Sequence, residues 1–351
     1  MDKNTSLFDF GYNFLGPLSS EYFHHLKLYT NQLNNPRIIF LAREGYFFNR
    51  AFDQLVKLGE FPNHPNNYLY VSRSFLFRIN IADVDTWQFS LNYKFKGTLS
   101  KILLGRFGFK LDLVKQVFSQ KQLEQKWVLP RELDELTNFL NQYIGELGAM
   151  VRESRHAYLD YLRGFDFNAS QDLVFVDIGY SGTIQKLLTH MLELDTHGVY
   201  LITTNGGANT VGRFKAHMKH VVKDQVSMGD GYKMLDRSLF LESLLTAPDG
   251  QLMDVVKLPV ESGKSFDFLF GRPAYTQRNF HELDRVMQGA EDATCHYLTH
   301  GIRFSIDELE ELYESFVSNR HMLPRVSWSL FEIDDAISGH GNVNPLQLFG
   351  M

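Results

Sequence analysis

The stretch Leu-Val-Phe-Val-Asp-Ile-Gly-Tyr-Ser-Gly-Thr-Ile-Gln at residues 173–185 decides the fold. It begins with an apolar, partly β-branched run, which is typical of a strand that is covered on both faces in an α/β sheet. A loop of one aspartate, glycines and hydroxyl residues follows, and apolar residues then recur at helical spacing from Ile184 to Met191. The pattern predicts a buried strand that leads into a helix through a tight turn. Free backbone N–H groups at such a helix start attract phosphate.

The chain holds two more places where an apolar run ends in polar residues. Residues 36–45, Pro-Arg-Ile-Ile-Phe-Leu-Ala-Arg-Glu-Gly, end in a loop that offers Arg43 and Glu44, and a third run ends in Ser72 and Arg73. Ligands of open α/β sheets bind outside the carboxyl ends of the strands. We therefore expect the three junctions to surround one crevice that suits a phosphorylated ligand with hydroxyl groups. The alternative is a set of structural corners whose Ser and Thr residues only cap helices.

Composition narrows the class of protein. The chain has 351 residues, of which 44% are hydrophobic and 22% charged, as is ordinary for a globular protein. Its net charge of -6 argues against nucleic acid as a partner. The single cysteine, Cys295, excludes an internal disulfide and a cysteine-based zinc site, and the 13 histidines show no metal-binding spacing. No apolar run approaches the roughly 18 residues of a transmembrane helix, so we expect a cytoplasmic protein, with the inner membrane surface as an alternative location.

The order of the expected elements predicts an α/β core that a helical segment interrupts. We assign residues 1–97 to the first part of the core, 98–165 to a helical insertion, and 166–215 to the second part with the phosphate loop. Residues 216–351 are expected to form a mixed, mainly helical C-terminal region. The insertion is inferred from apolar residues at helical spacing, which Pro130 breaks in the middle.

Two helix starts are also predicted. Apolar residues at helical spacing in residues 18–29 predict a first helix with Ser19 or Ser20 as its N-cap. Ser305 and Glu308 match a capping box at the start of a later helix. Both signals place a side-chain acceptor where the first N–H groups of a helix have no partner inside the helix.

Three segments of the chain resemble known families. Residues 174–183 are similar to the phosphoribosyl-diphosphate loop of type I phosphoribosyltransferases, in which an apolar strand ends in two acidic residues and a Thr-Gly pair follows. A closer similarity links residues 40–46, 70–73 and 176–185 to a family encoded in bacterial surface-polysaccharide gene clusters. Many proteins of this family are joined to, or encoded beside, a haloacid-dehalogenase phosphatase. The resemblance covers roughly residues 8–250, with strong motifs only at the three junctions.

The resemblance implies both a fold and an activity. The fold would be phosphoribosyltransferase-like, that is, a Rossmann-like and mostly parallel sheet flanked by helices. The activity would be the transfer of ribose 5-phosphate from phosphoribosyl diphosphate (PRPP) to a hydroxyl of a glycan acceptor, with release of pyrophosphate. The glycan would belong to the lipopolysaccharide O-antigen or to a capsule. PRPP, the acceptor glycan and a phosphatase that leaves a ribofuranose are therefore the expected partners.

The resemblance also implies roles for residues. Asp177 would accept hydrogen bonds from ribose hydroxyls, and Arg43 and Arg73 would hold the pyrophosphate together with Mg²⁺ bound through the substrate phosphates. Glu44 and Glu242 are candidates for the base that an acceptor hydroxyl needs. Asp177, Arg43, Glu44 and Arg73 are thus the expected catalytic residues. The expected substrate-binding residues are Ser72, Gly179, Tyr180, Ser181, Gly182, Thr183, Gln185 and Glu242.

Two features depart from the phosphoribosyltransferase pattern. Val176 and Ile178 flank Asp177 where that pattern has adjacent acids, so Asp177 would bind the ribose hydroxyls alone. The Arg-Glu-Gly and Asp-Ile-Gly loops are also about 130 residues apart, which is more than a minimal βαβ connection needs. The turn at 179–183, with its two hydroxyl side chains, stays the expected site of the 5-phosphate.

Other functions stay open. Asp177 ends a strand as the nucleophile of a haloacid-dehalogenase-type phosphatase does, although position 179 is glycine where that chemistry needs a second aspartate. A nucleotide-sugar glycosyltransferase and a non-catalytic module that binds a glycan or a nucleotide are further alternatives. Glu242 could equally be a boundary glutamate that reaches solvent or an arginine.

Overall fold

A six-stranded sheet forms the centre of the computed structural model, which describes residues 2–335 and 341–351. The strand order is β2-β1-β5-β6-β8-β7, and β7 at one edge runs antiparallel to β8. All other neighbours in this sheet run parallel. The strands are β1 (Arg37–Leu41), β2 (Asn66–Leu69), β5 (Leu173–Val176), β6 (Thr196–Ile202), β7 (Gly207–Val211) and β8 (Phe214–Lys223).

The three strands that carry the predicted junctions are neighbours. β1 lies between β2 and β5, with Ile39 opposite Asn67 on one side and opposite Phe175 on the other. Every residue of β5 is buried, as expected for a parallel strand with both faces covered. The expectation of an α/β fold with a mostly parallel sheet flanked by helices is therefore confirmed.

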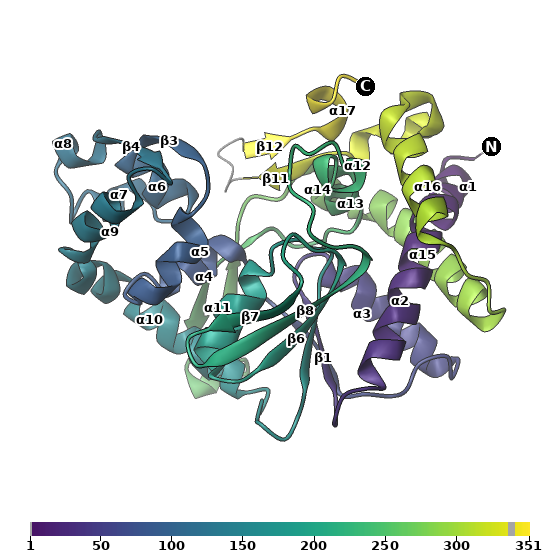
Figure 1. Cartoon of the computed structure of the whole chain (residues 1–351), viewed down its shortest axis with the longest axis horizontal. Helices are drawn as coiled ribbons and strands as arrows, with labels where there is room; N and C mark the ends of the chain where they lie inside the picture. Colours follow the sequence, from purple (N-terminus) through teal and green to yellow (C-terminus); the bar gives the residue numbers. More distant parts are fainter. Residues whose placement is uncertain (1, 336–340) are drawn as a thin grey trace.

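Helices from both ends of the chain cover one face of the sheet. The core on this face includes Phe40 of β1, Val174 of β5 and Phe52 of α3. α15 packs against α1, η1, α2 and α3, so segments far apart in sequence share this core. Figure 1 shows α1, α2, α15 and α16 together at the right of the molecule. The elements are α1 (Lys3–Phe10), the π-helical turn η1 (Gly11–Leu15), α2 (Gly16–Thr30), α3 (Gly45–Lys57), α15 (Phe280–Thr299) and α16 (Ile306–Ser318).

Three other helices cover the opposite face. The second core combines Ile39 of β1 and Phe175 of β5 with Leu187 and Leu188 of α11. α10 and α4 pack against each other and against β9. These helices are α4 (Arg73–Ile79), α10 (Ile144–Arg163) and α11 (Thr183–Leu192).

A helix-rich segment lies between α4 and α10, at the left of Figure 1, away from α1 and α16. The sequence predicts this insertion at 98–165, but its helices begin at α4, because Ser72 caps a helix soon after β2. Pro130 follows a strand here and does not break a helix. The segment contains η2 (Val84–Thr86), α5 (Trp87–Leu91), β3 (Phe95–Thr98), α6 (Leu99–Gly105), α7 (Leu111–Val114), α8 (Gln120–Leu123), β4 (Lys126–Leu129) and α9 (Leu133–Asn141), with β3 and β4 paired antiparallel.

The remaining elements extend the second part of the core and add strands to the mixed C-terminal region. The second part of the core extends past residue 215, because β8 continues to Lys223. Beyond it, two antiparallel pairs, β9 with β10 and β11 with β12, interrupt the helices that the sequence predicts. The elements are α12 (Lys233–Asp236), α13 (Leu239–Leu244), β9 (Leu252–Lys257), η3 (Val260–Ser262), β10 (Phe266–Phe270), α14 (Tyr275–Arg278), η4 (Arg320–Met322), η5 (Arg325–Leu330), β11 (Ile333–Asp335), β12 (Gly341–Val343) and α17 (Pro345–Leu348).

One of the two predicted helix starts is confirmed. Ser305 caps α16, and the Glu308 carboxylate accepts the Ser305 N–H at 2.7 Å, which completes the capping box. The predicted N-caps Ser19 and Ser20 lie inside α2, where their hydroxyls donate to carbonyls of the preceding turn, because η1 leads straight into this helix. Among the described residues, no helix combines the length and the apolar character needed to cross a membrane.

Candidate functional site

The candidate site lies where the order of the strands reverses. β1 is followed by α3 on one face of the sheet, and its parallel neighbour β5 is followed by α11 on the other face. The loops at the carboxyl ends of these two strands therefore diverge, which creates the place where open α/β sheets bind ligands. Residues 42–44 follow β1 and residues 177–182 follow β5. The peptide bonds Ala42–Arg43 and Gly179–Tyr180, one in each loop, are cis.

The three predicted carboxylates lie at this edge of the sheet, with Glu44 and Glu242 in electrostatic range of Asp177. Asp177 follows β5, Glu44 directly precedes α3, and Glu242 lies on α13. Burial, and then the negative charge of Glu44, raises the pKa of Asp177 to about 8, and Glu242 adds to this rise. Hydrogen bonds from the N–H groups of Ile178, at 2.8 Å, and Gly179 act in the opposite direction. An acid held among like charges is suited to bind a proton or a ligand that brings a cation.

Local contacts hold the two glutamates in place. The Glu44 carboxylate accepts the backbone N–H of Arg43 at 3.1 Å. The Glu242 carboxylate accepts the hydroxyl of Ser238 at 3.2 Å. Gly45 lets α3 begin directly against β1, because a Cβ at this position would lie 2.6 Å from a backbone carbon of that strand. The chain therefore supports these acids on rigid elements of the fold.

The turn between β5 and α11 keeps backbone donors available. Among the described residues, the N–H groups of Tyr180, Ser181 and Gly182 donate to no partner. The carbonyl of Tyr180 accepts the N–H of Thr204 at 3.0 Å, which fixes the turn to the loop after β6. Gly182 has a left-handed φ of 62°, and a Cβ there would lie 2.6 Å from the Met218 sulfur. The free N–H groups agree with the anion-binding turn that the sequence predicts.

Hydroxyl groups gather on the outer side of this turn. The hydroxyls of Ser181 and Thr183 share a hydrogen bond at 3.0 Å. Tyr93, from the helix-rich segment, donates to the Ser181 hydroxyl at 3.3 Å. The Lys186 ammonium donates to the Ser181 carbonyl at 2.9 Å. The turn therefore presents hydroxyl, N–H and ammonium donors from several elements.

Further positive charge surrounds the same turn. The Arg106 guanidinium lies 5.7 Å from the ring centroid of Tyr93. Burial raises the pKa of Tyr93, but its hydrogen bonds to Ser181 and Thr183, together with the charges of Arg73 and Lys186, bring this pKa below its ordinary value. Arg73 and Lys186 therefore lie close enough to the Tyr93 hydroxyl to stabilise negative charge there. A phosphate group on the turn would meet the same field.

Two predicted substrate-binding side chains make internal contacts instead. The Ser72 hydroxyl caps α4 and donates to the carbonyl of Leu252 at 2.6 Å. Gln185 is fully buried on the sheet side of α11, where its amide donates to the His217 carbonyl at 3.2 Å and accepts the Tyr200 hydroxyl at 2.8 Å. The polar groups of both side chains form hydrogen bonds that join elements of the fold. This corrects the prediction of Ser72 and Gln185 as substrate contacts.

Three side chains at the site were not predicted: Tyr93, Arg106 and Lys186. A signal for Lys186 was available, because a lysine in the first turn of a helix opposes the helix dipole unless an anion binds nearby. Tyr93 reaches the turn from the helix-rich segment, and Arg106 of the same segment lies against the Tyr93 ring. Their position depends on how that segment packs, which local sequence patterns do not reveal.

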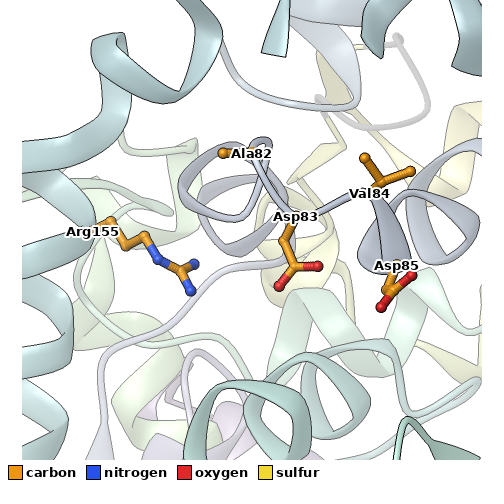
Figure 2. A pocket seen from close by; sticks show the side chains of 5 residues that line it. All are labelled: Ala82, Asp83, Val84, Asp85 and Arg155. Carbon is orange, nitrogen blue, oxygen red and sulfur yellow. The ribbon is translucent and has the colours of Figure 1, made fainter. Parts of the chain in front are cut away.

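A separate cavity of about 360 Å³ lies between the loop after α4 and helix α10. Figure 2 shows Arg155 of α10 pointing toward the Asp83 carboxylate, with Asp85 beyond it. Asp83 also hydrogen-bonds His190, near the end of α11 opposite the turn, and Arg155 contacts Asn80. Asp83 and Arg155 thus bond to neighbouring residues of the fold, and no residue of this cavity belongs to the strand ends. We therefore place the candidate site at the strand ends.

No protein-family model matches the chain, and no curated protein sequence matches it. Within the described residues, no group of three or more His, Cys, Asp and Glu side chains is placed to hold a metal ion. A functional conclusion therefore depends on the chemistry of the strand-end site.

Proposed function

We propose that the protein transfers ribose 5-phosphate from PRPP to a hydroxyl of a glycan acceptor and releases pyrophosphate. One observation carries the proposal: the loop after β5 is acidic at its Asp177 end and lined by hydroxyls and cations at its helix end. PRPP has groups that suit both ends, because its ribose hydroxyls can donate to carboxylates, its pyrophosphate can share Mg²⁺ with them, and its 5-phosphate can accept from the donors at the helix end. The resemblance of residues 40–46, 70–73 and 176–185 to a family of surface-polysaccharide biosynthesis supports the same function.

The 5-phosphate would bind at the start of α11. The free N–H groups of Tyr180, Ser181 and Gly182 supply directed donors for its oxygens. Lys186 and Arg73 supply positive charge beside the same turn, so we reassign Arg73 from the pyrophosphate, for which the sequence suggested it, to the 5-phosphate. Charge-assisted hydrogen bonds of this kind are shorter and stronger than neutral ones, so this end would anchor the donor.

The pyrophosphate and ribose would bind at the acidic end. Burial, and then the negative charge of Glu44, raises the Asp177 pKa, so a cation at this end would be stabilised. This donor set fits Mg²⁺, which commonly binds through substrate phosphates and one or two carboxylates. When bound, Mg²⁺ would neutralise charge that develops on the leaving pyrophosphate. Arg43, next to Glu44, would add a fixed positive charge on the same group.

The proposed reaction forms one bond and breaks one bond at the anomeric carbon. The acceptor oxygen bonds to C1 of the ribose, and the C1–O bond to pyrophosphate breaks, with its electron pair leaving on the pyrophosphate. The acceptor proton passes to a carboxylate. Glu44 and Glu242 are the candidates, because both lie near Asp177 at the carboxyl ends of the strands. Asp177 would hold the ribose hydroxyls and so fix the ring during the displacement.

The strand order supports a phosphoribosyltransferase-like assignment of the fold. In chain order, the five parallel strands of the sheet run 2-1-3-4-5, which is one of the common doubly wound arrangements. In that arrangement the ligand binds beside the first strand, at the place where Arg43, Glu44 and Asp177 lie. We propose the phosphoribosyltransferase-like fold on this basis together with the loop resemblance.

A thermal-shift comparison tests the proposal directly. The full chain is unfolded with PRPP and Mg²⁺, with a panel of nucleotide sugars and Mg²⁺, and with Mg²⁺ alone. A ligand at a hundred times its Kd stabilises by about 2.7 kcal/mol, which such an assay detects. Among these samples, we expect only the one with PRPP and Mg²⁺ to show a raised unfolding temperature. A rise with a nucleotide sugar and none with PRPP would contradict the proposal, as would efficient hydrolysis of p-nitrophenyl phosphate.

A further inference from the structure

A continuous group of aromatic side chains borders the carboxylate end of the site. We name it the aromatic strip, and its rings are only partly buried. Tyr68 and Tyr70 stand 5.3 Å apart between ring centroids, and Tyr70 lies 4.8 Å from Phe268 and 5.3 Å from Phe270. Tyr46 extends the strip at 6.2 Å from Tyr68. The strip thus joins α3, the end of β2 and strand β10 across the sheet edge.

Helix α10 holds the centre of the strip from behind. The carbonyl of Tyr70 accepts the Tyr158 hydroxyl at 3.1 Å, and the N–H of Tyr70 donates to the Tyr161 hydroxyl at 3.2 Å. The ring of Tyr161 also lies 4.9 Å from Phe268 in an edge-on arrangement. The aromatic faces are therefore held by hydrogen bonds and packing before any ligand arrives, which lowers the entropy cost of binding on them.

Carboxylates line the same strip. Burial, and then the charge and hydrogen bond of Asp249, raises the pKa of Tyr70. Burial, and then Tyr70, Glu44 and Asp249, raises the pKa of Tyr68, while Arg43 lowers it. Tyr68 therefore lies within electrostatic range of Asp249 on the strip and of the Arg43–Glu44 pair of the donor site. This shared residue places the strip beside the donor site.

We propose that the aromatic strip, with Asp249, is the subsite for the sugar of the acceptor that receives the ribose. This inference rests on the proposed function, because it assumes a donor at the strand ends. The apolar C–H face of a sugar ring packs on aromatic rings, and its hydroxyls bind carboxylates and phenols. Glu44 lies at the border of both sites, so a hydroxyl of a sugar on the strip would face the anomeric carbon of the donor.

The charges on the strip favour a sugar over other flat or apolar ligands. A nucleic acid would bring phosphates toward Asp249 and Glu44, which would repel them. An apolar helix of a partner protein would bury the Asp249 carboxylate without replacing its hydration. A neutral sugar ring provides both an apolar face and hydrogen-bond donors, and it matches the strip on both counts.

Saturation-transfer NMR on the full chain tests the subsite. The probes are methyl glycosides of glucose, galactose, mannose and rhamnose, each measured with and without PRPP and Mg²⁺. We expect at least one glycoside to receive saturation at its ring C–H protons. Phe268→Leu keeps an apolar side chain but removes the ring, so the affinity for that glycoside should fall about three- to tenfold. Asp249→Asn should also lower the affinity for the glycoside, although it removes no apolar contact.

The matched control is Phe167→Leu. Phe167 is another partly buried aromatic residue, and it lies beside Arg37 at the amino end of β1, on the opposite edge of the sheet. This variant should bind the glycosides as the wild type does. Thermal unfolding of each variant checks that the fold is retained, and Asp249→Asn keeps the test decisive if the Phe268 variant does not fold.

The outcomes separate this inference from the proposed function. No saturation of any glycoside by the wild type, or equal binding by all folded variants, would overturn the subsite even if PRPP binds. A wild type that binds glycosides through Phe268 and Asp249 but does not bind PRPP would support a sugar site here and overturn the donor assignment. Saturation that Phe268→Leu weakens, together with PRPP binding that stays within twofold of wild type, supports both.

Discussion

Asp177 and Glu291 are both carboxyl groups with a raised pKa, but Glu291 lies beside the cation Arg50, whereas the charges that raise the Asp177 pKa are those of carboxylates. Burial raises the pKa of Glu291 to about 7, and the positive charge of Arg50 acts against this rise. The Arg50 Nε lies 2.9 Å from a Glu291 carboxylate oxygen, and this pair joins α3 to α15. The Asp177 pKa of about 8 is instead raised further by Glu44 and Glu242. Glu291 has a positive partner within the chain, whereas the neighbouring charges that raise the Asp177 pKa are negative, which agrees with our proposal that a ligand brings a cation there.

This difference separates a structural acid from a functional one. A buried ion pair that spans two helices fixes their arrangement, and removing one partner leaves the other unpaired. A cluster of like charges costs stability, so the fold has no structural reason to keep it. Replacing each acid in turn should therefore give opposite results for activity and stability.

The largest effect is expected for Asp177→Asn. The amide removes the charge at the ribose end while keeping the size of the side chain, so pyrophosphate release from PRPP with an acceptor glycan should fall by at least about a hundredfold. The unfolding temperature should change little, because a carboxyl group with a pKa of about 8 is mostly neutral at pH 7 in the free protein, as the amide is. Activity near that of wild type, measured with the same donor, would show that Asp177 is a structural acid like Glu291.

Glu291→Ala should lower stability and spare donor binding. The variant leaves Arg50 with Asp284 alone and removes buried contacts between α3 and α15, so we expect a loss of about 1–3 kcal/mol. Urea unfolding measures this loss, and calorimetry with PRPP measures the affinity of the folded variant. A PRPP affinity that falls with unchanged stability would reverse the roles that we assign to the two acids.

The pH dependence of stability should sharpen the comparison. The pKa of Glu291 rises from 4.5 to about 7 in the fold, so the folded state binds its proton more tightly than the unfolded state does. This contribution to stability is complete below pH 4.5 and is lost as the pH rises through 7. Stability of the wild type should therefore fall across this window, and the fall should be smaller in Glu291→Gln. Identical slopes for both proteins, from unfolding at a series of pH values, would mean that Glu291 does not titrate in this way.

The smallest effect is expected for Arg43→Lys. This change keeps the positive charge but loses the planar fork that binds phosphate oxygens in pairs, so PRPP affinity should fall severalfold. Arg213→Lys is the control. Arg213 lies in the turn between β7 and β8, is exposed, and pairs with Glu193 at the end of α11. Equal affinities for both variants in calorimetry would remove Arg43 from the pyrophosphate site.

Much of the sheet could be predicted from the sequence, because its inner strands are continuous apolar runs that end in polar loops. Residues 173–176 form a buried strand and residues 37–41 form its neighbour, as these runs predict. The hairpin of β9 and β10 was missed although Phe266, Phe268 and Phe270 alternate with exposed residues, which is the pattern of a half-buried strand. The hairpin packs against Tyr70 and α10. These partners are far from the hairpin in sequence, so local patterns do not show the contact.

The candidate site could be predicted only in part, for a related reason. Glu44, Asp177 and Glu242 were identified because charged residues next to apolar runs stand out, and the structure brings these three together. Gln185 belongs to the same motif, yet the helical repeat turns it toward the sheet and away from the turn. Tyr93 comes from a segment whose pattern shows only a helix and a loop, so its contact with the turn depends on tertiary packing.

Calorimetric titration with two donors tests the central claim most directly. Wild type and Lys186→Met are each titrated, in the presence of Mg²⁺, with PRPP and with the analogue that has a hydroxyl in place of the 5-phosphate. The account predicts that wild type binds PRPP at least about tenfold more tightly than the analogue, because the turn at 180–182 and Lys186 hold the phosphate. It also predicts that Lys186→Met narrows this difference. Equal affinity of the wild type for both donors would contradict the account and would leave the turn as a structural corner between a strand and a helix.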